Sequence, residues 1–164
     1  SVKADGSALE RRSAAIGWGA VGTDAQHAVF QLLHQGTHLV PVEFIAARQP
    51  EHGLDDAHHR ALLINCFAQG AALMAGQGSD DPARRYAGDR PSVTILLDQV
   101  DPAGLGALLA FYEHRTFANA VMLGINPFDQ FGVELGKQIA KSMDSGGDNS
   151  FDPSTRALIE LAGL

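Results

Sequence analysis

The order of strand-like and helix-like segments constrains the fold of this chain more than any other feature. Residues 38–47 and 92–100 are rich in β-branched and aromatic side chains and predict strands, and residues 56–75 between them predict a long helix. Neighbouring strands that are joined by a helix run parallel, so this order predicts an α/β fold with a mostly parallel sheet. Helical patterns dominate the rest of the chain and predict a C-terminal helical cover.

Capping signals predict where several helices begin and end. Thr23, with Gln26 three residues later, predicts the start of a first helix, which Gly36 ends. Pro102 predicts the start of another helix, and the apolar residues 117–125 fit either its continuation or a buried strand.

Glycine, proline and short polar residues mark the connections between elements. They predict a loop at 76–91 and a linker at 144–150, which a short terminal helix follows. Pro41 indicates an edge or a bulge in the first strand, because proline cannot donate a ladder hydrogen bond. We therefore expect two parts, residues 1–143 and a linker with a C-terminal helix at 144–164.

Charge and cysteine content exclude several classes of partner. The 164 residues carry a net charge of −7, which argues against nucleic-acid binding because that requires a basic surface. No apolar run approaches the about 20 residues of a membrane span, so we expect no membrane partner. Cys66 is the single cysteine and allows no internal disulfide, which favours a reducing compartment and predicts a cytoplasmic protein.

A polar stripe on a glycine-bearing helix is the first candidate site. Gln130, Glu134 and Lys137 follow the i, i+4, i+7 spacing that places side chains on one helix face. Gly132 and Gly136 each cost about 1 kcal/mol relative to alanine inside a helix, which suggests that something approaches this backbone closely. The alternative is a solvated face with a Glu134–Lys137 pair.

Histidines supply the second candidate. His27 and His34 are seven residues apart on one face of the first predicted helix, and the alternative for each is a solvent-facing or hydrogen-bonded side chain. The other histidines have no spacing typical of a metal site, so we expect no metal. They are His38, His52, His58, His59 and His114.

Residues 17–22 match the pattern G-x-G-x-x-G ahead of a predicted helix, as in dinucleotide-binding loops. The preceding strand would cover only residues 14–16, Trp18 is bulky where backbone must approach a pyrophosphate, and the expected acid would be Glu43 in mid-strand. A nucleotide-binding oxidoreductase is therefore a weak alternative.

Three segments resemble the phosphoglucose isomerase family. Residues 128–137 fill every defined position of its C-terminal signature, aromatic–acid–Gln–x–Gly–Val–Glu–x–x–Lys. Residues 18–27 resemble W-G-x-x-G-T-x-x-Q-H and are followed by H-Q-G-T at 34–37, and residues 105–114 resemble L-G-A-L-x-A-x-Y-E-H. The segments occur in the family's order across nearly the whole chain.

The resemblance implies a three-layer sugar isomerase fold with a mostly parallel sheet and C-terminal helices. Residues 1–143 would be the C-terminal part of the catalytic fold, within its second sugar isomerase domain. The family interconverts glucose 6-phosphate and fructose 6-phosphate by ring opening and a cis-enediol, without a cofactor. A non-catalytic sugar-phosphate-binding domain of the same fold is the alternative.

The resemblance also implies roles for individual residues. His27 and Lys137 would assist ring opening as catalytic groups, and Gln130 would bind the substrate. The phosphate-binding loop and the catalytic glutamate of the family would lie upstream of Ser1, in the N-terminal remainder of the enzyme, so we expect no activity from these residues alone. The family is a homodimer, which implies that His27 serves the partner subunit.

Overall fold

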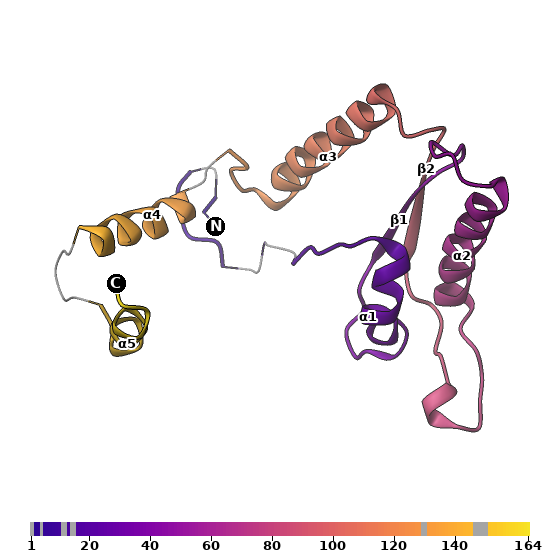
Figure 1. The fold of residues 1–164 in the computed structure, drawn as a ribbon, viewed down its shortest axis with the longest axis horizontal. Coiled ribbons are helices and arrows are strands. Elements are labelled where there is room, and N and C mark those ends of the chain that lie inside the picture. Colours follow the sequence, from indigo (N-terminus) through magenta and orange to yellow (C-terminus); the bar gives the residue numbers. More distant parts are fainter. Residues whose placement is uncertain (1, 4, 11–12, 14–15, 129–130, 146–150) are drawn as a thin grey trace. The chain divides into compact units, whose positions relative to one another are not determined.

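The computed structural model describes residues 2–3, 5–10, 13, 16–128, 131–145 and 151–164. They form two compact units, Arg12–Ala118 and a second unit of Ser1–Arg11 with Asn119–Leu164, each of which is considered by itself. The elements occur in the order α1 Gly22–Gln35, β1 Val42–Ala47, α2 Asp56–Ala75, a 3-10 helix at Pro82–Arg84, β2 Ser92–Leu97, α3 Pro102–Leu123, α4 Phe131–Asp144 and α5 Pro153–Ala162 (Figure 1).

Parallel pairing of β1 and β2 forms the centre of the larger unit, with α2 as the crossover between them (Figure 1). The register runs from Val42 opposite Ser92 to Ala47 opposite Leu97. Two backbone hydrogen bonds of 2.8 and 2.9 Å continue the ladder just beyond the strand ends. The predicted α/β class with a parallel sheet is confirmed.

Helices lie on both faces of this small sheet. Phe44 of β1 faces α1, where its ring centroid is 6.3 Å from that of Phe30, and a Cβ added to Gly70 of α2 would lie 3.7 Å from the Phe44 ring. Glu43 points to the opposite face, as neighbouring strand residues do, and accepts a 3.0 Å hydrogen bond from Tyr112 of α3. The layer order is α1 and α2, sheet, α3.

The buried core of the described residues is small. Its hydrophobic members are Leu33, Ala46 and Leu73 in the larger unit and Ala120 in the other. Two strand residues on the Glu43 face, Ile45 and Val93, are 47% and 58% exposed. Parallel sheets are normally covered on both faces, so much apolar surface of this sheet remains open.

The predicted cap of the first helix is wrong. The helix begins at Gly22, one residue before Thr23, and its N-cap is Val21, whose extended backbone has no side-chain hydrogen bond to the helix. Gly36 ends the helix as predicted, and its N–H donates to Leu32 O at 2.8 Å.

Other boundaries also differ from the sequence patterns, among them the end of β2 at Leu97, whereas α2 has the predicted bounds. β1 begins at Val42 because Pro41 has no N–H, and the first ladder bond runs from Val42 N to Pro91 O at 3.0 Å. The ambiguous residues 117–125 continue α3 as far as Leu123.

The loop at 76–91 has a tightly closed base. Backbone hydrogen bonds of 2.9 Å run in both directions between Gln77 and Tyr86. Gly76 and Gly88 have φ values of +63° and +72°, and a Cβ on Gly76 would lie 2.4 Å from the Gly88 nitrogen. Only glycine fits this crossing, because the two backbone segments of the loop base lie in direct contact.

The end of α1 packs against this loop through His34. Its ring meets that of Tyr86 edge-on, with centroids 5.3 Å apart, and lies near Phe30 and Arg90. His34 Nδ1 is buried without a hydrogen-bond partner among the described residues. Burial, and secondarily the charge of Arg90, lowers the pKa of the His34 imidazole.

The smaller unit contains α4 and α5. Asp152 caps α5 by accepting hydrogen bonds from the backbone nitrogens of Ser154 and Thr155 at 3.0 and 3.1 Å. Nothing lies within 4 Å of a Cβ placed on Gly132 or Gly136, so the close neighbour expected at α4 is not found among the described residues. None of the described helices is both long and apolar enough to cross a membrane.

The His34 environment predicts a loss of stability in acid. Because its pKa is lowered in the folded state, the unfolded chain binds more protons below about pH 6.5, and stability falls as the pH drops through that window. We expect the midpoint temperature of thermal unfolding to fall between about pH 7.5 and 5.5. The fall should be larger for the unsubstituted protein than for its His34→Gln variant. Equal falls in the two proteins would contradict this assignment.

Candidate active site

His27 lies on the second turn of α1, and its side chain is exposed. Its nearest recorded polar neighbour is Gln26, whose Nε2 is 3.5 Å from His27 Nε2. The helix is fixed mainly at its other end, where Leu33 is 4% exposed. An imidazole held in this way is accessible to a substrate.

Lys137 lies on α4, and its side chain is also exposed. Among the described residues it forms no ion pair with Glu134, although this face of α4 is exposed as the solvated-face alternative expects. Gln130, the predicted substrate-binding residue, lies outside the described residues, and α4 is described from Phe131 onward. An exposed ammonium can donate hydrogen bonds to a substrate oxygen and stabilise negative charge on it.

The structure therefore places His27 in the unit Arg12–Ala118 and Lys137 in the other unit. His27 stands on a helix of which half the residues are exposed, and Lys137 on one that is exposed almost throughout. Spacing along the sequence could not have paired these two side chains. They enter one candidate site only because both match positions of a family motif.

The dinucleotide-binding alternative lacks its structural context. The residues described ahead of α1 form no strand, and α1 begins directly at Gly22. Glu43, the acid such a site would use, is engaged by Tyr112 and Arg115 of α3 instead. Burial, and secondarily the hydrogen bond to Glu43, raises the pKa of the Tyr112 phenol. Glu43 therefore links a strand to a helix and is not available to a ribose.

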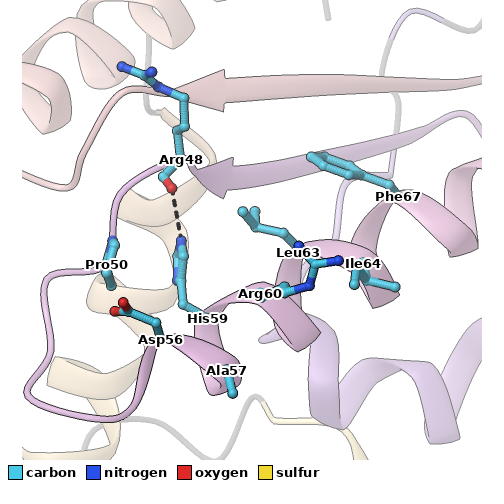
Figure 2. Close-up of a pocket in the computed structure, with 9 residues that line it drawn as sticks. All are labelled: Arg48, Pro50, Asp56, Ala57, His59, Arg60, Leu63, Ile64 and Phe67. Carbon is cyan, nitrogen blue, oxygen red and sulfur yellow. Dashed lines mark hydrogen bonds between the residues drawn. The ribbon is translucent and has the colours of Figure 1, made fainter.

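A hollow of about 720 Å³ at the carboxyl end of β1 was not predicted from the sequence (Figure 2). It is bounded mainly by the first half of α2. His59 Nε2 donates to the carbonyl oxygens of Ala47 and Arg48 at 3.0 and 3.2 Å, as the dashed line in Figure 2 shows for Arg48. The Arg48 guanidinium pairs with Asp98 at 3.0 Å. His59 thus joins α2 to the end of β1, and the ion pair joins the segments that follow β1 and β2.

Cys66 is a free, half-buried thiol on α2. Burial raises its pKa, which keeps the thiol protonated and unreactive at neutral pH. The histidines, cysteine and carboxylates of the described residues include no group of three that could hold a metal ion.

Comparison with known proteins identifies the family. The family model for phosphoglucose isomerase matches residues 1–159. A glucose-6-phosphate isomerase of Rhizorhabdus wittichii is 76% identical over 161 residues, which cover 98% of this chain and 32% of that protein. One of Zymomonas mobilis is 64% identical over 162 residues, with the same coverage.

A solved structure agrees with these matches. The crystal structure of a glucose-6-phosphate isomerase from Chlamydia trachomatis superimposes with a TM-score of 0.86 at 38% identity, and the match covers 99% of this chain and 32% of that one. The chain thus spans about a third of the length of the relatives it matches. At these identities, and with the family pattern covering residues 1–159, the chain belongs to the phosphoglucose isomerase family.

Proposed function

We propose that this chain forms the C-terminal part of an enzyme that interconverts glucose 6-phosphate and fructose 6-phosphate. The observation that carries the proposal is the family match over residues 1–159 together with 76% identity to a protein named glucose-6-phosphate isomerase. The reaction is an aldose–ketose isomerisation and needs no cofactor. A non-catalytic sugar-phosphate-binding domain is less well supported, because the relatives from Rhizorhabdus and Zymomonas are named as isomerases.

His27 and Lys137 are the catalytic groups that we assign to this chain. Ring opening requires a proton to leave one sugar oxygen and negative charge on another to be stabilised. The exposed imidazole of His27 suits the proton transfer, and the ammonium of Lys137 suits the charge. Gln130 would bind the sugar by hydrogen bonds through its side-chain amide.

The carbon-bound proton moves between C2 and C1 through a cis-enediol, and this step needs a carboxylate base. We assign the base and the phosphate-binding loop to the upstream part of the longer polypeptide, because this chain spans 32% of its relatives. The same upstream part would cover the open face of the β1–β2 sheet, where Ile45 and Val93 are exposed.

We further propose a cytoplasmic homodimer in which His27 serves the active site of the partner subunit. The single free cysteine is compatible with a reducing compartment. An exposed histidine near the start of α1 is accessible to a second subunit, and two-fold dimers are the commonest oligomers.

Removing either catalytic group should slow turnover. The test protein is a full-length chimera in which these 164 residues replace the matching segment of the Rhizorhabdus wittichii protein. His27→Ala and Lys137→Ala should each lower kcat by about 10²–10⁴-fold, the usual contribution of a positioned acid or base. The exposed side chains of His58 on α2 and Lys141 on α4 supply matched controls, since alanine there should leave kcat unchanged. Parental kcat in His27→Ala would refute its role.

Mixing the two inactive chimeras tests the shared site. Random exchange of His27→Ala and Lys137→Ala subunits makes half of the dimers mixed. If His27 serves the partner, each mixed dimer has one intact site, and about a quarter of the parental activity returns. If His27 serves its own subunit, no intact site forms and no activity returns.

The 164 residues by themselves should not isomerise sugar phosphates, because the base and the phosphate loop would be missing. Purification from a host that lacks its own isomerase, followed by a coupled assay, measures this. Turnover above the blank would show that these residues contain a complete site.

A further inference from the structure

The polar contacts of α1 in the described residues are concentrated at its C-terminal end. The N-cap residue Val21 provides no side-chain hydrogen bond, whereas Gln35 Nε2 donates to the carbonyl oxygens of Ala83 and Arg85 at 3.1 and 2.9 Å. These two acceptors lie 48 and 50 residues further along the chain, in the loop 76–91. One amide therefore joins the helix end to a distant loop.

The Gln35 amide is held in a defined orientation. Its Oε1 accepts a hydrogen bond from Gln31 Nε2, one turn earlier on α1, which leaves Nε2 to face the loop. The same helix end receives a second bond, from an Arg90 guanidinium nitrogen to Gly36 O at 3.1 Å. Gln35, from the helix, and Arg90, from the loop, thus both join the end of α1 to the loop.

The loop is a firm support for this contact. Its base is closed by the paired backbone bonds of Gln77 and Tyr86 and by the glycine crossing at Gly76 and Gly88. Arg90 N also donates to Leu73 O at 3.1 Å, so the loop is bonded to α2 immediately before it enters β2. Gln35 therefore connects α1 to the part of this loop just beyond its closed base, at Ala83 and Arg85.

His27 lies toward the opposite end of α1 from this contact. Eight residues separate His27 from Gln35, which corresponds to about 12 Å along the helix axis. A tilt of about 5° at the anchored end would move the His27 backbone by about 1 Å, a displacement that can cost about 10²-fold in rate. The side chain that fixes the helix angle would thus fix the imidazole.

We propose that Gln35 is a positioning residue for His27. The hydrogen bonds from its amide to Ala83 O and Arg85 O set the angle of α1, and through it the place of the imidazole in the active site. The inference rests on the catalytic role proposed for His27. Gln35 would thus act on the reaction without contacting either the substrate or His27.

The test uses the full-length chimera. Gln35→Ala removes both donors, and Gln35→Glu keeps the shape of the side chain while removing them. We expect both variants to lower kcat for glucose 6-phosphate by about 10-fold or more, with KM changed by less than about 2-fold. Asn65→Ala is the matched control, because it removes one side-chain-to-backbone bond of 2.8 Å within α2 and should leave kcat unchanged.

A double substitution separates positioning from general stability. If Gln35 acts through His27, then Gln35→Ala should cause no further loss of kcat in the His27→Ala background. A full additional loss in that background, or parental kcat in both Gln35 variants, would overturn the positioning role. Parental kcat in His27→Ala would instead refute the proposed function of His27, and the positioning role with it.

Discussion

The parallel pairing of β1 with β2 is the interaction on which the rest of the larger unit depends. Two parallel strands require a crossover, and the 20 residues of α2 provide it. The register also decides what each face contacts, because Phe44 faces α1 and α2 while Glu43 faces α3. A slip of one residue would exchange these faces, placing the carboxylate against aromatic rings and the ring against Tyr112.

Both ends of the crossover are also fastened by contacts outside the strand ladder. At the start of α2, Asp55 accepts a hydrogen bond from Ala57 N at 3.0 Å, and His59 bonds the carbonyl groups at the end of β1. At its end, Gly76 and Gly88 close the loop base. In the helices that carry the proposed catalytic side chains, no described residue of α4 is buried and Leu33 alone is buried in α1. Exposure gives a substrate access, and it makes positioning depend on a few polar contacts.

Local sequence patterns predicted the elements whose boundaries depend on nearby residues. They did not predict contacts between residues that are far apart in the sequence. The bounds of α2 follow from its own composition, but β1 is shorter than its apolar run because Pro41 cannot join the ladder. The Thr23 cap failed because the backbone is already helical at Gly22. No pattern relates Gln35 to carbonyl groups 48 and 50 residues away. Spacing alone left the candidate catalytic residues as ordinary exposed side chains, and only the family resemblance distinguished them.

The net charge of the chain is compatible with the proposal that another part of the polypeptide binds the phosphate. The chain has a net charge of −7, so it repels a sugar phosphate unless cations are arranged locally. The guanidinium groups of Arg48, Arg84 and Arg115 are each paired with a carboxylate. Backbone N–H groups at a helix start can bind a phosphate without such cations. A phosphate loop of that kind upstream would leave Lys137 to act on the sugar oxygens, which is the role that ring opening requires.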